Sequence, residues 1–118
     1  MSWIRRSENL TTKDRIAVQD GPGHMIARSL IESDSELNRK GRLLARNTLE
    51  KDCGVGWHIH EGDTEIYIML KGEAEYNDNG TVTTLHPGDV TFTGNGVGHS
   101  ITNRKDEPVE FIALILYV

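Results

Sequence analysis

Short apolar stretches alternate with turn-forming residues from Arg42 to the end of the chain, and this spacing predicts β-strands. An Asn-Gly pair at 79–80, a strong hairpin signal, and a Pro-Gly pair at 87–88 separate neighbouring stretches. The expected strands are RLLARNTLE, WHIH, EIYIML, EAEY, TVTTL, VTFT, HSITN and VEFIALILYV, with a bend at residues 54–56 before the second. Short strands separated by turns predict an antiparallel β-sandwich or barrel.

The first forty residues have a different pattern. Residues 1–22 are polar and end in a turn cluster, Asp-Gly-Pro-Gly, so we expect an irregular arm with one short strand. Residues 24–31 have the composition of a strand. Residues 33–41 begin with capping residues and end in glycine, which fits either one helical turn or a polar loop. The length of 118 residues fits one domain with one core.

Composition limits the kinds of binding partner and the cellular compartment that we expect. The net charge of -5 disfavours a nucleic-acid partner, because an acidic surface repels phosphate backbones. No apolar run approaches membrane-spanning length and no signal-peptide core is visible, so we expect a cytoplasmic protein with no membrane partner. The single cysteine, Cys53, excludes an internal disulfide, and a buried side chain is favoured over a catalytic thiol.

Candidate chemistry is concentrated in the run WHIHEGDTEIYIML. His58 and His60 are two positions apart, so in a strand their side chains point to the same face. Glu65 follows a short turn, and we expect the three side chains to converge on one side of a hairpin. His99, after the glycine-rich run GNGVG, is a fourth candidate. Three imidazoles and one carboxylate suit a divalent transition metal: manganese, iron, nickel, cobalt, copper or zinc.

These residues also carry a resemblance to a known family. His58-x-His60, four residues, Glu65, six residues and Gly72 resemble the first cupin motif, and the segment from Gly88 to Asn103 around His99 resembles the second. Departures are Gly94, where many cupins carry proline, and Asp52, where a glycine is usual. The resemblance covers roughly residues 41–118. It implies an all-β, antiparallel double-stranded β-helix (a cupin or jelly-roll barrel) as the core, with residues 1–40 as an N-terminal arm and first strand.

The reaction is less constrained than the fold, since one fold hosts many functions. Four protein ligands leave positions open on the metal, where a small carboxylate, sugar or diketone could bind for Lewis-acid or oxygenase-type chemistry. Cupin relatives include dioxygenases, decarboxylases and isomerases. The alternative is a non-catalytic cupin that binds or senses a small ligand. A metal-free, epimerase-like cupin is disfavoured because the ligand set is complete.

Strand alternation assigns further residues to the interior. If Glu65 points inward, Tyr67 and Met69 do too, which makes Tyr67 a candidate catalytic acid or base, with wall packing as the alternative. Asp63 is expected in a solvated turn, with a contact to a ligand histidine as the alternative. Either Arg46 or Asn47 should face the pocket, and an inward Arg46 would favour a carboxylate ligand.

The last stretch suggests a second copy of the chain. VEFIALILYV is apolar on both faces, and residues 66, 68 and 70 form a second apolar face opposite the ligand side. A single small barrel has one interior, so the outer face requires a cover. Cupins commonly pair barrel to barrel, and we therefore expect a homodimer.

Overall fold

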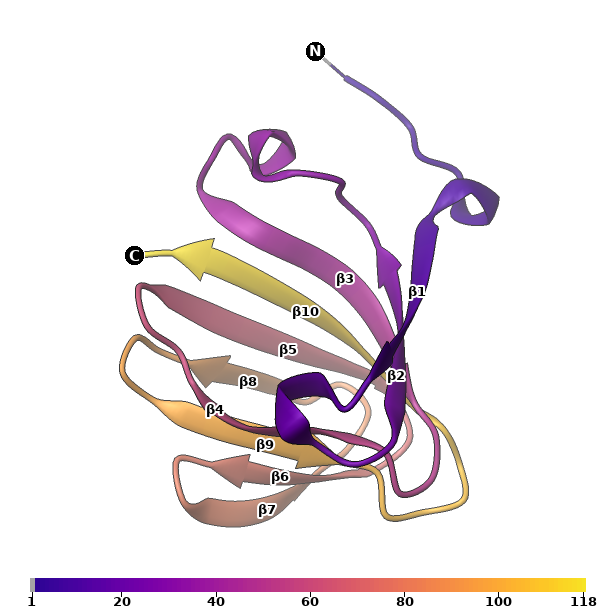
Figure 1. Ribbon diagram of the computed structural model, residues 1–118, viewed down its shortest axis with the longest axis vertical. Coiled ribbons are helices and arrows are strands. Elements are labelled where there is room, and N and C mark those ends of the chain that lie inside the picture. The colour runs from indigo at the N-terminus through magenta and orange to yellow at the C-terminus, as the bar shows by residue number, and fades with distance from the viewer. Residues whose placement is uncertain (1) are drawn as a thin grey trace.

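Two antiparallel sheets face each other in the computed structural model, which describes residues 2–118 (Figure 1). One sheet has six strands in the order β1-β2-β3-β10-β5-β8, and the other has four in the order β4-β9-β6-β7. The strands are β1 (Thr11–Ile16), β2 (His24–Ser29), β3 (Gly41–Leu49), β4 (Gly54–Ile59), β5 (Asp63–Lys71), β6 (Ala74–Asp78), β7 (Thr81–Leu85), β8 (Val90–Thr93), β9 (Gly98–Thr102) and β10 (Val109–Tyr117). Three short 3-10 helices complete the described chain: η1 (Ser7–Asn9), η2 (Val18–Asp20) and η3 (Asp34–Leu37). Residues 2–118 contain no helix that is both long and apolar enough to cross a membrane.

The core lies between the sheets and follows the two-residue period of the strands. On β10, Val109, Phe111, Ala113 and Ile115 are each at most 5% exposed, and the residues between them face outward. Val109, Phe111 and Ala113 pack against inward residues of β3, β5, β6 and β9. The core therefore stabilises the barrel by burying apolar area from both sheets.

The prediction that residues 57–70 form a hairpin at the candidate site is wrong. β4 and β5 follow each other in sequence, but β4 pairs with β9, and β5 pairs with β10 and β8. The turn at residues 60–62 therefore carries the chain from the small sheet to the large one. The physical reason is the composition of β5, which is apolar on both faces and so takes a central place, whereas β4 forms the edge of the small sheet.

The bend expected at residues 54–56 is also wrong, because these residues belong to β4. The irregularity there is a shift in the β4–β9 register between Val55 and His58. Gly56 lies within this stretch, and a side chain at this position would collide with the Gln19 carbonyl oxygen. Glycine is therefore required by the close approach of a second backbone.

The N-terminal residues extend the large sheet. β1 and β2 form an antiparallel pair at its edge, and in Figure 1 this pair runs across the ends of the other strands. The connection between them contains η2, which lies against β4. The expected arm with one short strand corresponds to residues up to β1, and the helical turn considered for residues 33–41 is η3.

Candidate metal centre

Three histidines and one glutamate meet inside the barrel. His58 and His60 come from β4 and the residue after it, Glu65 from β5 and His99 from β9, so both sheets contribute. One nitrogen or carboxylate oxygen of each lies within 4.8 Å of the corresponding atom of every other. His60, Glu65 and His99 are buried, and His58 is partly exposed. We call these four residues the donor group.

The separations within the donor group test whether one ion would fit. His99 Nε2 lies 3.0 Å from Glu65 Oε1, 3.1 Å from His60 Nε2 and 3.1 Å from His58 Nε2. His60 Nε2 lies 3.0 Å from the same Glu65 oxygen. Two donors that each lie about 2.1 Å from one ion, at right angles, are about 3.0 Å apart. The donor group therefore has the spacing and the chemistry to hold a divalent transition metal.

The second ring nitrogen of each histidine is held by the protein. His58 Nδ1 donates to the Gly56 carbonyl oxygen (2.8 Å), and His60 Nδ1 donates to Asp63 Oδ1 (2.7 Å). Because both partners can only accept, these two rings carry a proton on Nδ1, which leaves Nε2 as the nitrogen that can bind a metal. His99 Nδ1 lies 2.8 Å from the Tyr76 hydroxyl and 2.9 Å from Thr93 Oγ1. Such contacts fix the rings of metal-binding histidines.

Asp63 corrects the expectation of a solvated turn. It is 6% exposed, and while Oδ1 accepts from His60, Oδ2 accepts from Arg42 Nε at 3.1 Å. β5 begins at Asp63, so its side chain shares the inward face of Glu65 two positions later. The alternative contact with a ligand histidine is therefore the observed one. Glu61, by contrast, is exposed at the turn.

Charge in the donor group follows from burial and hydrogen bonding. Burial alone would raise the pKa of Glu65, but contacts with the three imidazoles outweigh it and hold that pKa well below its usual range. Burial lowers the pKa of His99, which favours the neutral, metal-binding form. The contact with Glu65, followed by that with Asp63, raises the pKa of His60. A metal site requires a carboxylate and neutral imidazoles, so an ion bound to the donor group would displace a proton held between His60 and Glu65.

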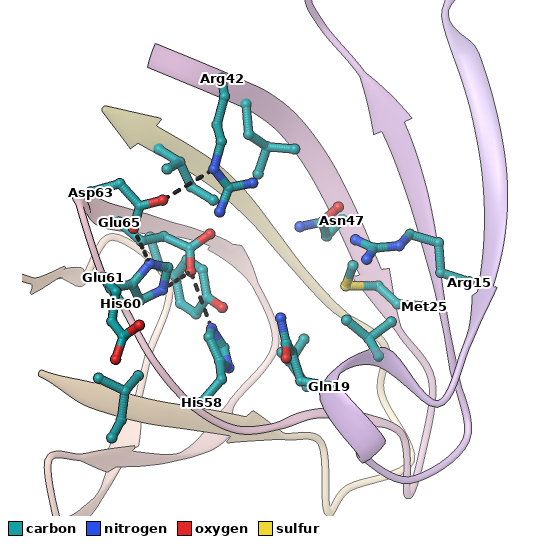
Figure 2. A pocket seen from close by; sticks show the side chains of 16 residues that line it. Arg15, Gln19, Met25, Arg42, Asn47, His58, His60, Glu61, Asp63 and Glu65 are labelled. Atoms are coloured by element: carbon teal, nitrogen blue, oxygen red, sulfur yellow. Dashed lines mark hydrogen bonds and ion pairs between the residues drawn. The ribbon is translucent and has the colours of Figure 1, made fainter. Parts of the chain in front are cut away.

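A cavity of about 290 Å³ opens onto the donor group (Figure 2). Asn47 faces it, whereas Arg46 points outward and pairs with Glu110 at 3.1 Å. Arg46 therefore gives no support to the expectation of a carboxylate ligand. The lining residues are Arg15, Val18, Gln19, Met25, Arg42, Leu43, Asn47, Val55, His58, Ile59, His60, Glu61, Asp63, Glu65, Tyr67 and Ile115.

Tyr67 lines the cavity as strand alternation predicts. It is 3% exposed, and its ring stacks on His99 with centroids 5.0 Å apart. Burial and the nearby Glu65 carboxylate raise its pKa well above the ordinary value, so the phenol remains protonated at neutral pH. It can therefore donate a hydrogen bond but cannot serve as a base in this state.

Sequence reasoning missed several residues around the donor group. Tyr76 and Thr93 contact His99, and Arg15, Gln19 and Arg42 line the cavity. Tyr76 shares the inward face of Ala74 on β6, so strand alternation could have placed it in the interior. Arg15 and Gln19 carry no such signal, because their position depends on how the N-terminal hairpin folds over the barrel.

Known proteins resemble the chain in sequence and in structure. The family model described as Cupin domain matches residues 46–115. An oxalate-binding protein from Thermotoga maritima is 37% identical over 113 residues, covering 96% of this chain and 93% of that protein. A crystal structure from the same organism, described as a predicted oxalate decarboxylase, is 36% identical, covers 98% of this chain and all of that one, and superposes with a TM-score of 0.93. A cupin-2 domain protein from Rhodospirillum rubrum shares the fold at 14% identity, with a TM-score of 0.77 over 98% of this chain and 74% of that one. The likeness confirms the expected double-stranded β-helix.

Proposed function

Because the chain belongs to the cupin family, we propose that it binds a divalent transition metal and, on that metal, a small carboxylate. The ligands are His58, His60, Glu65 and His99. The observation that carries the proposal is the convergence of three imidazole nitrogens and one carboxylate oxygen, several of them about 3.0 Å apart, at the base of a cavity. A bound metal would supply a Lewis acid that accepts a carboxylate oxygen.

A carboxylate is favoured over a sugar or a diketone for two reasons. The Thermotoga maritima relative, 37% identical over nearly the whole chain, is named for binding oxalate. Arginine side chains also line the cavity, and a guanidinium binds a carboxylate through paired hydrogen bonds. Oxalate and related small acids are accordingly the first ligands to test.

Binding is favoured over turnover by the state of the acids and bases at the cavity. Glu65 is one of the proposed metal ligands, Asp63 accepts from His60 Nδ1, and Tyr67 stays protonated. Glu61 is the one carboxylate lining the cavity that has no hydrogen-bond or ion-pair partner within residues 2–118. An enzyme, the second candidate, would use Tyr67 as hydrogen-bond donor to the ligand and would act as a decarboxylase, dioxygenase or isomerase.

The test begins with metal analysis of protein purified without added metal. We expect close to one divalent ion per chain, and its loss in His60→Ala. Calorimetry with oxalate should then show binding to the metal-loaded protein and none to the stripped protein. The proposal is contradicted if protein from cells grown in metal-containing medium holds no metal. It is also contradicted if oxalate binds the stripped protein as tightly as the metal-loaded protein.

We also propose that the outer face of the large sheet joins two copies of the chain. Register places apolar residues side by side there: Leu114 lies opposite Leu44 and Ile66, and Ile66 lies opposite Phe92. Phe92 is 68% exposed and its neighbour Val90 63%. Exposed apolar patches of this kind mark interaction sites, and a two-fold contact of like faces is the commonest closed arrangement.

A further inference from the structure

The N-terminal hairpin supplies a cation to the cavity. Arg15, the fifth residue of β1, points into the cavity towards Asn47 in Figure 2. Its neighbour Asp14 accepts from His24 at 2.7 Å, and no carboxylate of residues 2–118 lies within 4.0 Å of the Arg15 guanidinium. A guanidinium directed at a cavity without a carboxylate partner is available to an anion.

Asn47 places a buried hydrogen-bond acceptor at the same wall of the cavity. Its side chain is 4% exposed, it lines the cavity, and its Oδ1 has no hydrogen-bond partner. Leaving a buried amide oxygen unpaired is unfavourable, and an oxygen accepts only from a donor, so this atom is placed to accept an N–H of the Arg15 guanidinium, which points towards Asn47 in Figure 2. Asn47 lies at the centre of β3, paired with Ala27 on one side and Phe111 on the other, so its backbone is fixed.

The backbone that follows Arg15 is held in an unfavourable conformation. Ala17, Gln19 and Asp20 have φ of 50°, 52° and 59°, which L-residues other than glycine seldom adopt. Gly21 and Gly56 hold this turn directly against β4, because a Cβ on either would collide with the other segment's backbone. Strained backbone concentrates at binding sites. Here it fixes Arg15 relative to β4, the strand that carries His58.

We propose that Arg15 and Asn47 form a second anion-binding point, so that the ligand is a dicarboxylate held at both ends. One carboxylate binds the metal of the donor group, and the other accepts hydrogen bonds from the Arg15 guanidinium, which donates a further N–H to Asn47 Oδ1 and is held in place by it. This inference rests on the proposed metal-dependent carboxylate binding and names the class of ligand. The N-terminal hairpin, rather than the barrel core, would then distinguish a ligand with two carboxylates from a ligand with one.

The test compares each diacid with the amide that replaces one of its carboxylates. The probes are oxalate and oxamate, malonate and malonamate, and succinate and succinamate, measured by calorimetry on protein loaded with the metal with which it purifies. In Arg15→Gln, we expect the best-bound diacid to lose about tenfold or more in affinity and its amide partner less than about threefold, since charge-assisted bonds are the stronger ones. Lys13→Gln, the same charge change on the same strand but outside the cavity lining, should leave both affinities unchanged.

Asn47→Leu separates a ligand-binding role from a structural one. If Asn47 Oδ1 holds the Arg15 guanidinium when a ligand is bound, removing this unpaired oxygen should leave the melting temperature of the ligand-free protein unchanged or higher, while diacid affinity falls. A lowered melting temperature with unchanged diacid affinity makes Asn47 structural and overturns its part in the proposal. Equal losses for diacid and amide in Arg15→Gln, or no loss, overturn the second anion-binding point while leaving carboxylate binding at the metal intact. If the wild-type protein binds none of the six probes, both proposals are overturned.

Discussion

Replacing Asp63 with asparagine should weaken metal binding without unfolding the protein. The carboxylate accepts from two donors, His60 Nδ1 at 2.7 Å and Arg42 Nε at 3.1 Å. An asparagine of nearly the same size can offer its oxygen to only one of them, and its amide hydrogens then face the other. If the amide group faces His60, the ring is driven to the tautomer with its proton on Nε2, which cannot bind metal.

The size of the effect follows from burial. The side chains of His60 and Asp63 are 4% and 9% exposed, so solvent screens their contact little, and loss of such a partner lowers metal affinity about 10–100-fold. The Arg42 side chain is 50% exposed, so its ion pair with Asp63 contributes about 1 kcal/mol or less. Arg42→Gln should therefore lower metal affinity by only a few fold and serves as the matched control.

Competition with a chromophoric chelator measures both affinities, and circular dichroism of the metal-free variants checks that they fold. We expect the order wild type, Arg42→Gln, Asp63→Asn from tightest to weakest. Equal affinities for wild type and Asp63→Asn would refute the argument that Asp63 sets the His60 tautomer. Equal losses in the two variants would show that the outer ion pair, and not the buried contact, carries the effect.

Three further outcomes are expected. Removing the metal with a chelator should lower the melting temperature by about 10 °C or more, because an ion bound only to the folded state stabilises it, and an unchanged value in a calorimetric scan contradicts a bound ion. Tyr67→Phe should leave metal affinity unchanged, and it should reduce turnover only if the protein is an enzyme that uses the phenol as a donor, which a screen of small carboxylic acids on both variants decides. Light scattering should give twice 13.2 kDa for the wild type, with an interface above about 1,000 Å², and a monomer for Phe92→Asp or Ile68→Asp; a monomeric wild type refutes pairing through this face.

Strand alternation accounts for most of what the sequence could predict about the site. With Glu65 pointing inward, the two-residue period placed Tyr67 and Met69 inside, and both are buried. Applied from His99, the same rule assigns Ile101 and Asn103 to the interior, and both are fully buried. Asn103 donates to the Leu49 and Glu107 carbonyl oxygens and so orders the strand end rather than the cavity. Side-chain facing is a local property, and local pattern is sufficient to predict it.

Strand pairing is not a local property, and here the sequence was insufficient. The same short turn after His60 can close a hairpin or carry the chain to another sheet, and the choice depends on which partners bury both faces of β5. Because Asp63 was assigned to a turn, it was not expected inside the barrel, although it stands two positions before Glu65 and shares its face. A strand boundary placed two residues too late thus removed a hydrogen-bond partner of His60 from the expected interior.

The two parts of the cavity wall differ in how far the sequence could predict them, and the difference has a physical origin. The donor group lies on strands of the barrel core, where spacing within two motifs constrains position. Arg15 and Gln19 reach the cavity only because β1 and β2 continue the large sheet and the intervening turn docks on Gly56. Changes in that hairpin can alter the charge and shape of the cavity while leaving the donor group untouched. A shared metal site with differing ligands among related chains is therefore the expected consequence of this architecture.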